Sequence, residues 1–130
     1  MEEIVTRSFI LTWDPGLRLA VSQNTSGETP SSDDAEKMRE AISRWSGDDG
    51  RPFAILVNAL GRKTADAKYR AFWGDFFKTH KEHCYIAAYN VGPIVRVAAE
   101  MFSLGTGIHL KTFATETEAR AWLGRHGFAC

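Results

Sequence analysis

Two short, continuous apolar runs constrain the fold more than any other feature of this sequence. The first is FAILVNA, Phe53 to Ala59, and the second is CYIAAYN, Cys84 to Asn90. Neither run alternates between polar and apolar residues, and both are too short for a typical buried helix. Such runs are typical of strands that are buried on both faces, in a largely parallel sheet covered by helices. We therefore expect an α/β fold.

An N-terminal β-hairpin is predicted ahead of these runs. Ile4–Trp13 and Leu17–Gln23 both alternate in polarity, which is the pattern of a strand with one buried face. Between them lies DPG, Asp14 to Gly16, where proline presets the turn and glycine tolerates positive φ. We expect one strand on each side of this turn.

Amphipathic patterns predict about four helices. Apolar residues recur at helical spacing in the first two, at Ala35, Met38, Ile42 and Trp45 and at Tyr69, Phe72, Trp73, Phe76 and Phe77. Thr64 is placed to cap the second helix. The third begins at Pro93 and runs to about Ser103, and the fourth begins with a capping box of Thr115 and Glu118.

These elements form one domain over residues 1–130. With a last strand at Ile108–Ala114, their order is β-β-α-β-α-β-α-β-α. An initial hairpin followed by alternating strands and helices predicts a mixed sheet with helices packed on it.

Composition narrows the class of protein. The chain has 130 residues, of which 44% are hydrophobic, enough to bury one core. Lys and Arg number 16, as do Asp and Glu, and a protein that neutralises phosphates would be clearly basic, so nucleic-acid binding is disfavoured. The apolar stretches are too short to span a membrane, and the acidic start does not resemble a signal peptide. Two cysteines, Cys84 and Cys130, favour free thiols in the cytoplasm.

The residue patterns predict neither catalysis nor a metal or cofactor. The nearest approach to a metal cluster is HKEHC, His80 to Cys84, but zinc usually takes three or four ligands and no second pair follows. The carboxylate pairs Asp33-Asp34 and Asp48-Asp49 are interpreted as solvated surface. We therefore expect a protein that is not an enzyme and uses no cofactor or metal.

The candidate binding site lies at the ends of the two apolar runs and in the helix that follows the second. Open α/β sheets bind ligands at the carboxyl ends of their strands, where helix N-termini present free N–H groups. The helix has one apolar face, formed by Ile94, Val97, Ala98, Met101 and Phe102. The helix is either a core helix with one solvent-exposed edge, or its apolar face binds a partner or ligand. The candidate site residues are Asn58, Thr64, Asn90, Gly92, Pro93, Arg96 and Glu100.

From Phe53 to Leu123 the sequence resembles the STAS domain superfamily, in particular the SpoIIAA-like proteins described as STAS/SEC14-like. FAILVNALG is similar to the central strand of that fold, and CYIAAYN followed by GPIVRVAAEMFSLGTG is similar to its strand, turn and helix. HLKTFATETEARAWL resembles its closing strand and helix. The resemblance implies a SpoIIAA-like mixed sheet and a regulatory module, since STAS domains bind partner proteins and sometimes nucleotides or lipids.

One family feature is missing. Some members are switched by phosphorylation of a serine in an Asp-Ser-Ser-Gly motif, at the start of the helix after the central strand. The corresponding place here is KTADA, with Thr64. The motif is absent, so Thr64 is interpreted first as a helix cap.

We therefore expect a non-enzymatic protein-interaction module that docks through the Gly92–Gly107 helix and the helix start at Thr64. One alternative is a carrier or sensor of a small apolar or anionic ligand, in a SEC14-like pocket lined by the second helix and by Met101 or Phe102. Another is a small enzyme with no recognisable site. Four tryptophans and eight phenylalanines are many for one small core, which favours a homodimer.

Overall fold

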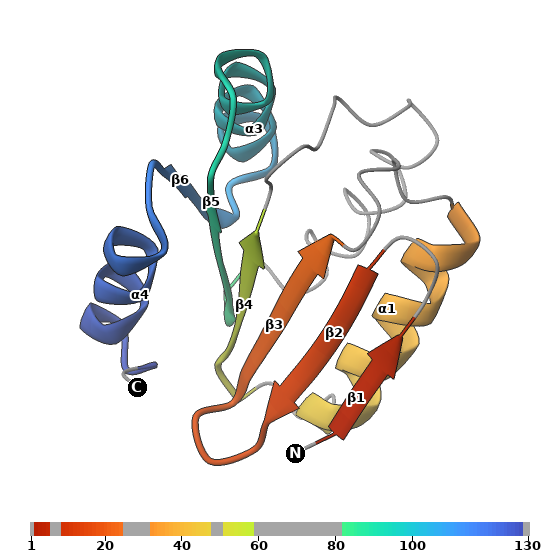
Figure 1. The fold of residues 1–130 in the computed structure, drawn as a ribbon. Helices are drawn as coiled ribbons and strands as arrows, with labels where there is room; N and C mark the ends of the chain where they lie inside the picture. The colour runs from red at the N-terminus through yellow and green to blue at the C-terminus, as the bar shows by residue number, and fades with distance from the viewer. Residues whose placement is uncertain (1, 6–8, 25–31, 48–50, 59–81, 129–130) are drawn as a thin grey trace.

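A computed structural model describes residues 2–5, 9–24, 32–47, 51–58 and 82–128, which form a six-stranded sheet and three helices (Figure 1). The strands are β1 (Glu2–Val5), β2 (Phe9–Asp14), β3 (Leu19–Asn24), β4 (Phe53–Asn58), β5 (Cys84–Tyr89) and β6 (His109–Phe113). The helices are α1 (Ser32–Ser46), α3 (Pro93–Thr106) and α4 (Glu116–Arg125). The remaining predicted helix, with its start at Thr64, lies outside the described residues.

The sheet is mixed, as predicted. Its strands follow one another in chain order, from β1 at one edge to β6 at the other. The first three strands pair antiparallel, and β3 to β6 pair parallel. The carboxyl ends of β3, β4, β5 and β6 therefore lie at the same end of the sheet.

The prediction of one strand over Ile4–Trp13 is wrong. Ile4 in β1 pairs with Leu11 in β2, so the two halves of this segment run antiparallel side by side. Alternation of polarity continues through both halves, and for this reason the sequence pattern did not reveal the reversal. As a result β1 becomes the edge strand, where Val5 is 61% exposed, while Leu11 is buried.

The predicted hairpin turn between β2 and β3 is confirmed. The Asp14 side chain closes it, because its Oδ1 accepts hydrogen bonds from the backbone N–H of Gly16 at 2.9 Å and of Leu17 at 3.2 Å. Aspartate commonly makes this local bond to the backbone two residues on. Arg18, the last residue before β3, has a positive φ of 54°.

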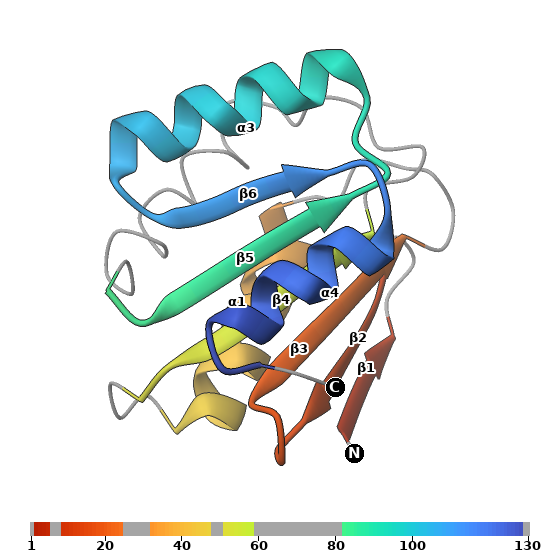
Figure 2. The same ribbon diagram turned by 90° about the vertical axis from the view of Figure 1, so that its left-hand side faces the viewer.

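The predicted burial of β4 on both faces is also confirmed. Phe53 and Ile55 belong to one buried cluster, with Met38 and Ile42 of α1. Ala54 and Leu56 belong to a second, which includes Ala119 and Leu123 of α4. Figure 2 shows α4 in front of the sheet and α1 behind it.

The predicted cap at the start of α4 is confirmed for Thr115, whose hydroxyl accepts a hydrogen bond from the Glu118 backbone N–H at 3.3 Å. The Glu118 carboxylate accepts from the Thr115 hydroxyl at 3.2 Å, and not from the Thr115 backbone N–H as in a full capping box. This cap satisfies an N–H group that the helix itself leaves without a partner.

Two matched substitutions test the position of the core. Leu56→Ala removes a fully buried side chain of β4 and should lower the free energy of unfolding by about 2–5 kcal/mol. Leu104→Ala makes the same change on α3 at a side chain that is 87% exposed, and should change it by no more than about 0.5 kcal/mol. Denaturant titrations measure both. Equal losses would contradict the assignment of Leu56 to the core.

Candidate functional site

Asn58 and Asn90 meet at the carboxyl ends of β4 and β5. The two strands are adjacent and parallel, and Asn58 pairs in register with Tyr89. The Asn90 side-chain Nδ2 donates a hydrogen bond to Asn58 Oδ1 at 3.1 Å. Asn90 has a positive φ of 58°, a conformation that asparagine adopts more readily than most residues. The sequence placed both residues at strand ends that could line one crevice, and the structure brings their side chains into contact.

The chain then turns into α3 through Gly92 and Pro93. Gly92 is the extended N-cap residue and has no side chain that could cap the helix, and Pro93 occupies the first helical turn. The Arg96 backbone N–H donates to the Gly92 carbonyl at 2.9 Å, which closes the first turn. There is no acidic residue in this turn, so no side chain of the first turn balances the partial positive charge of the helix start.

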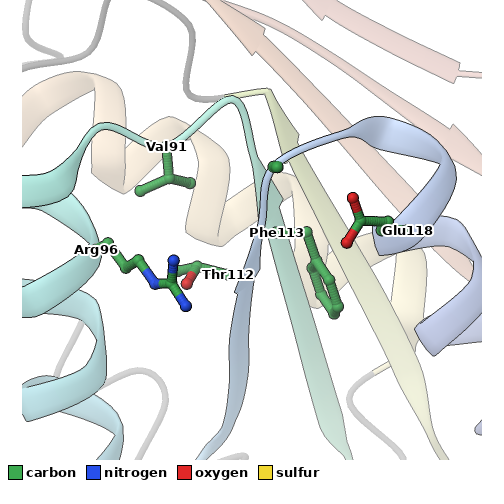
Figure 3. A pocket seen from close by; sticks show the side chains of 6 residues that line it. Val91, Arg96, Thr112, Phe113 and Glu118 are labelled. Carbon is green, nitrogen blue, oxygen red and sulfur yellow. The ribbon is translucent and has the colours of Figure 1, made fainter.

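A hollow of about 210 Å³ lies beside this helix start. It is lined by Val91, Arg96, Thr112, Phe113, Ala114 and Glu118. In Figure 3 the Arg96 side chain extends from α3 toward Thr112 at the end of β6, while Phe113 and Glu118 lie on the other side of that strand. Asn58 and Asn90 do not line this hollow, so the predicted site residues form two neighbouring groups instead of one crevice.

Among the α3 side chains that the structure describes, three large apolar ones project into solvent. Val97 is 56% exposed, Met101 68% and Leu104 87%. They are spaced by four and three residues, so they lie on one side of the helix. We call these three residues the outer stripe of α3. Beside the stripe, Arg96 Nε and Glu100 Oε1 form an exposed ion pair at 3.3 Å.

The sequence left two interpretations of this helix, a core helix with one solvated edge or a binding face. A core helix would bury Val97 and Met101, but both are exposed. Half-buried Ser103 ties α3 to the residue just before β6, because its hydroxyl donates to the Ile108 carbonyl at 3.2 Å. The side chains of Ile94, Ala98 and Phe102, the rest of the predicted face, lie outside the described set.

Sequence reasoning missed the β6 side of the site. Thr112, Phe113 and Ala114 were assigned to the last strand, and Glu118 to a helix cap. The available signal was topological: if β6 pairs with β5 in parallel, its carboxyl end must lie beside the start of α3. Thr64, the remaining candidate, lies outside the described residues.

The described residues near the sheet offer neither a reactive thiol nor a metal-binding group. Cys84 is a buried free thiol, and burial raises the pKa of that thiol far above its usual range. It therefore stays protonated and is a poor nucleophile at neutral pH. Within the described ranges, no group of three or more His, Cys, Asp and Glu side chains is placed to hold a metal ion.

A polar chain links β5 to α4. Tyr89 is a buried residue whose hydroxyl donates a hydrogen bond to Glu116, and Glu116 Oε2 accepts a bond from Arg120 Nε at 2.7 Å. Burial and the negative charge of Glu116 raise the pKa of Tyr89. The Arg120 hydrogen bond lowers the pKa of Glu116, with a smaller contribution from Tyr89. The chain fixes the first turn of α4 against the end of β5.

No family model matches the sequence, and no curated protein matches it at a significant level. None of the helices within the described ranges is both long and apolar enough to cross a bilayer.

The lowered pKa of Glu116 predicts a pH-dependent stability. The carboxylate form is the one stabilised by folding, so its contribution is complete above the unfolded pKa of about 4.3 and is lost as the pH falls through the lower folded value. Glu116→Gln should cost about 0.3–0.5 kcal/mol at pH 7, because the ion pair is well exposed. Denaturant titrations across pH should show the two proteins converging in acid. A constant difference at every pH would contradict the ion-pair explanation.

Proposed function

We propose that this protein is a non-enzymatic, STAS-like regulatory module of the cytoplasm that binds a partner protein through the outer stripe of α3. The observation that carries the proposal is the exposure of Val97, Met101 and Leu104 on one side of one helix. Single exposed apolar residues are common on protein surfaces, whereas several large ones in contact are typical of interaction sites.

The binding strength of the outer stripe depends on the apolar area that a partner can cover. Full burial of a Val, Leu or Met side chain is favourable by about 1.5–3 kcal/mol. Association itself costs at least about 4 kcal/mol, so the stripe supports binding only together with neighbouring surface. Arg96 and Glu100 supply a charged rim, which contributes to orientation and specificity more than to affinity. An amphipathic helix that offers its apolar side to a groove is a recurring mode of recognition.

The ligand-carrier alternative has less support. It expected Met101 or Phe102 to line an apolar pocket, but Met101 is among the most exposed apolar residues described. An anionic ligand in the hollow would meet the Arg96 guanidinium, yet Glu118 lines the same hollow, and its carboxylate would repel the ligand. The protein-interaction proposal needs neither group to bind a small molecule.

A binding experiment with a matched control tests the proposal. Met101→Glu and Leu104→Glu each place a charge in the outer stripe, and Val5→Glu makes the same kind of change at an exposed apolar residue of β1. The partner should be identified by crosslinking from a photoreactive residue at position 105, next to the stripe, and its affinity measured with the purified proteins. We expect the α3 variants to weaken binding at least about tenfold and Val5→Glu to leave it unchanged.

Circular dichroism should confirm that all three variants keep the wild-type fold, because the replaced side chains are exposed. If the purified partner bound the α3 variants as tightly as the wild type, the outer stripe would not be the docking surface.

A further inference from the structure

The exposed residues of α3 have a symmetrical arrangement along the helix. Among the described side chains between Pro93 and Gly105, seven residues are exposed: Pro93, Arg96, Val97, Glu100, Met101, Leu104 and Gly105. Six of them fall into three pairs with nearly the same midpoint. Arg96 and Glu100 are centred on Ala98, Pro93 and Leu104 between Ala98 and Ala99, and Val97 and Met101 on Ala99.

This arrangement is what a two-fold axis requires. An interface between two identical copies related by such an axis is self-complementary: if one residue contacts a second, the second also contacts the first. Two α3 helices packed antiparallel, with the axis passing near Ala98 and Ala99, would place Val97 of one copy opposite Met101 of the other. Pro93 and Leu104 would face each other in the same way, so apolar residues meet apolar residues along the seam.

The charged residues match under the same operation. In this antiparallel pair the two-fold axis is perpendicular to both helices. A residue on one flank of the first helix is therefore on the same side of the interface as its equivalent on the second helix. Arg96 and Glu100 lie on one flank of the outer stripe, as their spacing on a helix dictates, and their side chains are 64% and 59% exposed. Each Arg96 would therefore lie beside the partner copy's Glu100, and no pair of like charges would be opposed.

We propose that the occupant of the outer stripe is a second copy of this chain, in an antiparallel α3–α3 pair. This inference rests on the proposed function, because it uses the same surface and names its partner. The formal net charge of the chain is zero, so two copies approach without net repulsion.

The interface would be small. A single helix face buries less than the roughly 800 Å² per partner of a standard stable complex. The dimer should therefore form reversibly, with a dissociation constant in the range of about 10 μM to about 1 mM. Sedimentation velocity over that range of concentrations is the appropriate measurement.

Charge-reversed variants give a test that depends on contact between copies. Arg96→Glu opposes two carboxylates across the axis, and Glu100→Arg opposes two guanidinium groups, so each variant alone should dimerise at least about tenfold more weakly than the wild type. An equimolar mixture of the two should associate again, because every charge then faces its opposite on the other chain. Damage to the ion pair within one helix cannot produce this rescue, since mixing leaves each chain unchanged.

Met101→Glu should abolish the association, and Val5→Glu should not affect it. Restored association in the mixture, together with loss in Met101→Glu, supports the antiparallel pair. A wild-type protein that stays monomeric up to about 1 mM, a dimer insensitive to Met101→Glu, or a mixture that associates no better than its components would each overturn it.

These outcomes separate the two proposals. A monomeric wild type that still binds another protein through Met101 and Leu104 would refute the self-association and leave the interaction module intact. A dimer that resists Met101→Glu but is broken by Val5→Glu would place the interface on β1 instead of α3. Both proposals would fail if the α3 variants changed neither the dimerisation of this protein nor its binding to any other protein.

Discussion

The burial of β4 on both faces is the constraint on which the rest of the structure depends. Phe53 and Ile55 pack in one cluster while Ala54 and Leu56 pack in the other. Each face of the sheet must therefore be covered, and α1 and α4 provide that cover (Figure 2). Adjacent parallel strands also need long connections that return the chain to the starting end of the sheet. The ends of β4, β5 and β6 consequently gather at one end, where the Asn58–Asn90 pair and the hollow beside Arg96 are found.

The exposure of the outer stripe follows from the position of α3 in this arrangement. The helix connects β5 to β6, and β6 is the last strand of the sheet. Figure 2 shows α3 running along β6, at the margin of the sheet instead of over its middle. A helix above the middle of a sheet has neighbours on both sides, whereas one at the margin keeps a free side. Apolar residues on that free side are unnecessary for covering the sheet, so their presence requires a separate explanation, such as a binding partner.

Much of this fold is predictable from local sequence signals, because the elements concerned carry their own physical cause. The unbroken apolar runs predict β4 and β5, Asp14-Pro15-Gly16 predicts the turn that Asp14 closes, and Thr115 with Glu118 predicts the start of α4. The reversal between β1 and β2 was missed because both halves share one alternating pattern.

The candidate site was harder to predict than the fold. Helical periodicity groups Val97 and Met101 with apolar neighbours, but it does not say which side of the helix meets the sheet. That depends on where β6 ends the sheet, a property of the whole topology. The lining of the hollow by Thr112, Phe113 and Glu118 was missed for the same reason, since it needs the parallel pairing of β5 with β6.

The outer stripe and the two buried clusters have no residue in common. Substitutions at Val97, Met101 or Leu104 therefore alter what the surface binds without opening a cavity in the core, whereas most substitutions in β4 would do the reverse. A protein divided in this way can change its partners over evolutionary time at little risk to its fold. The same division makes α3 a suitable place to build new binding specificity by design.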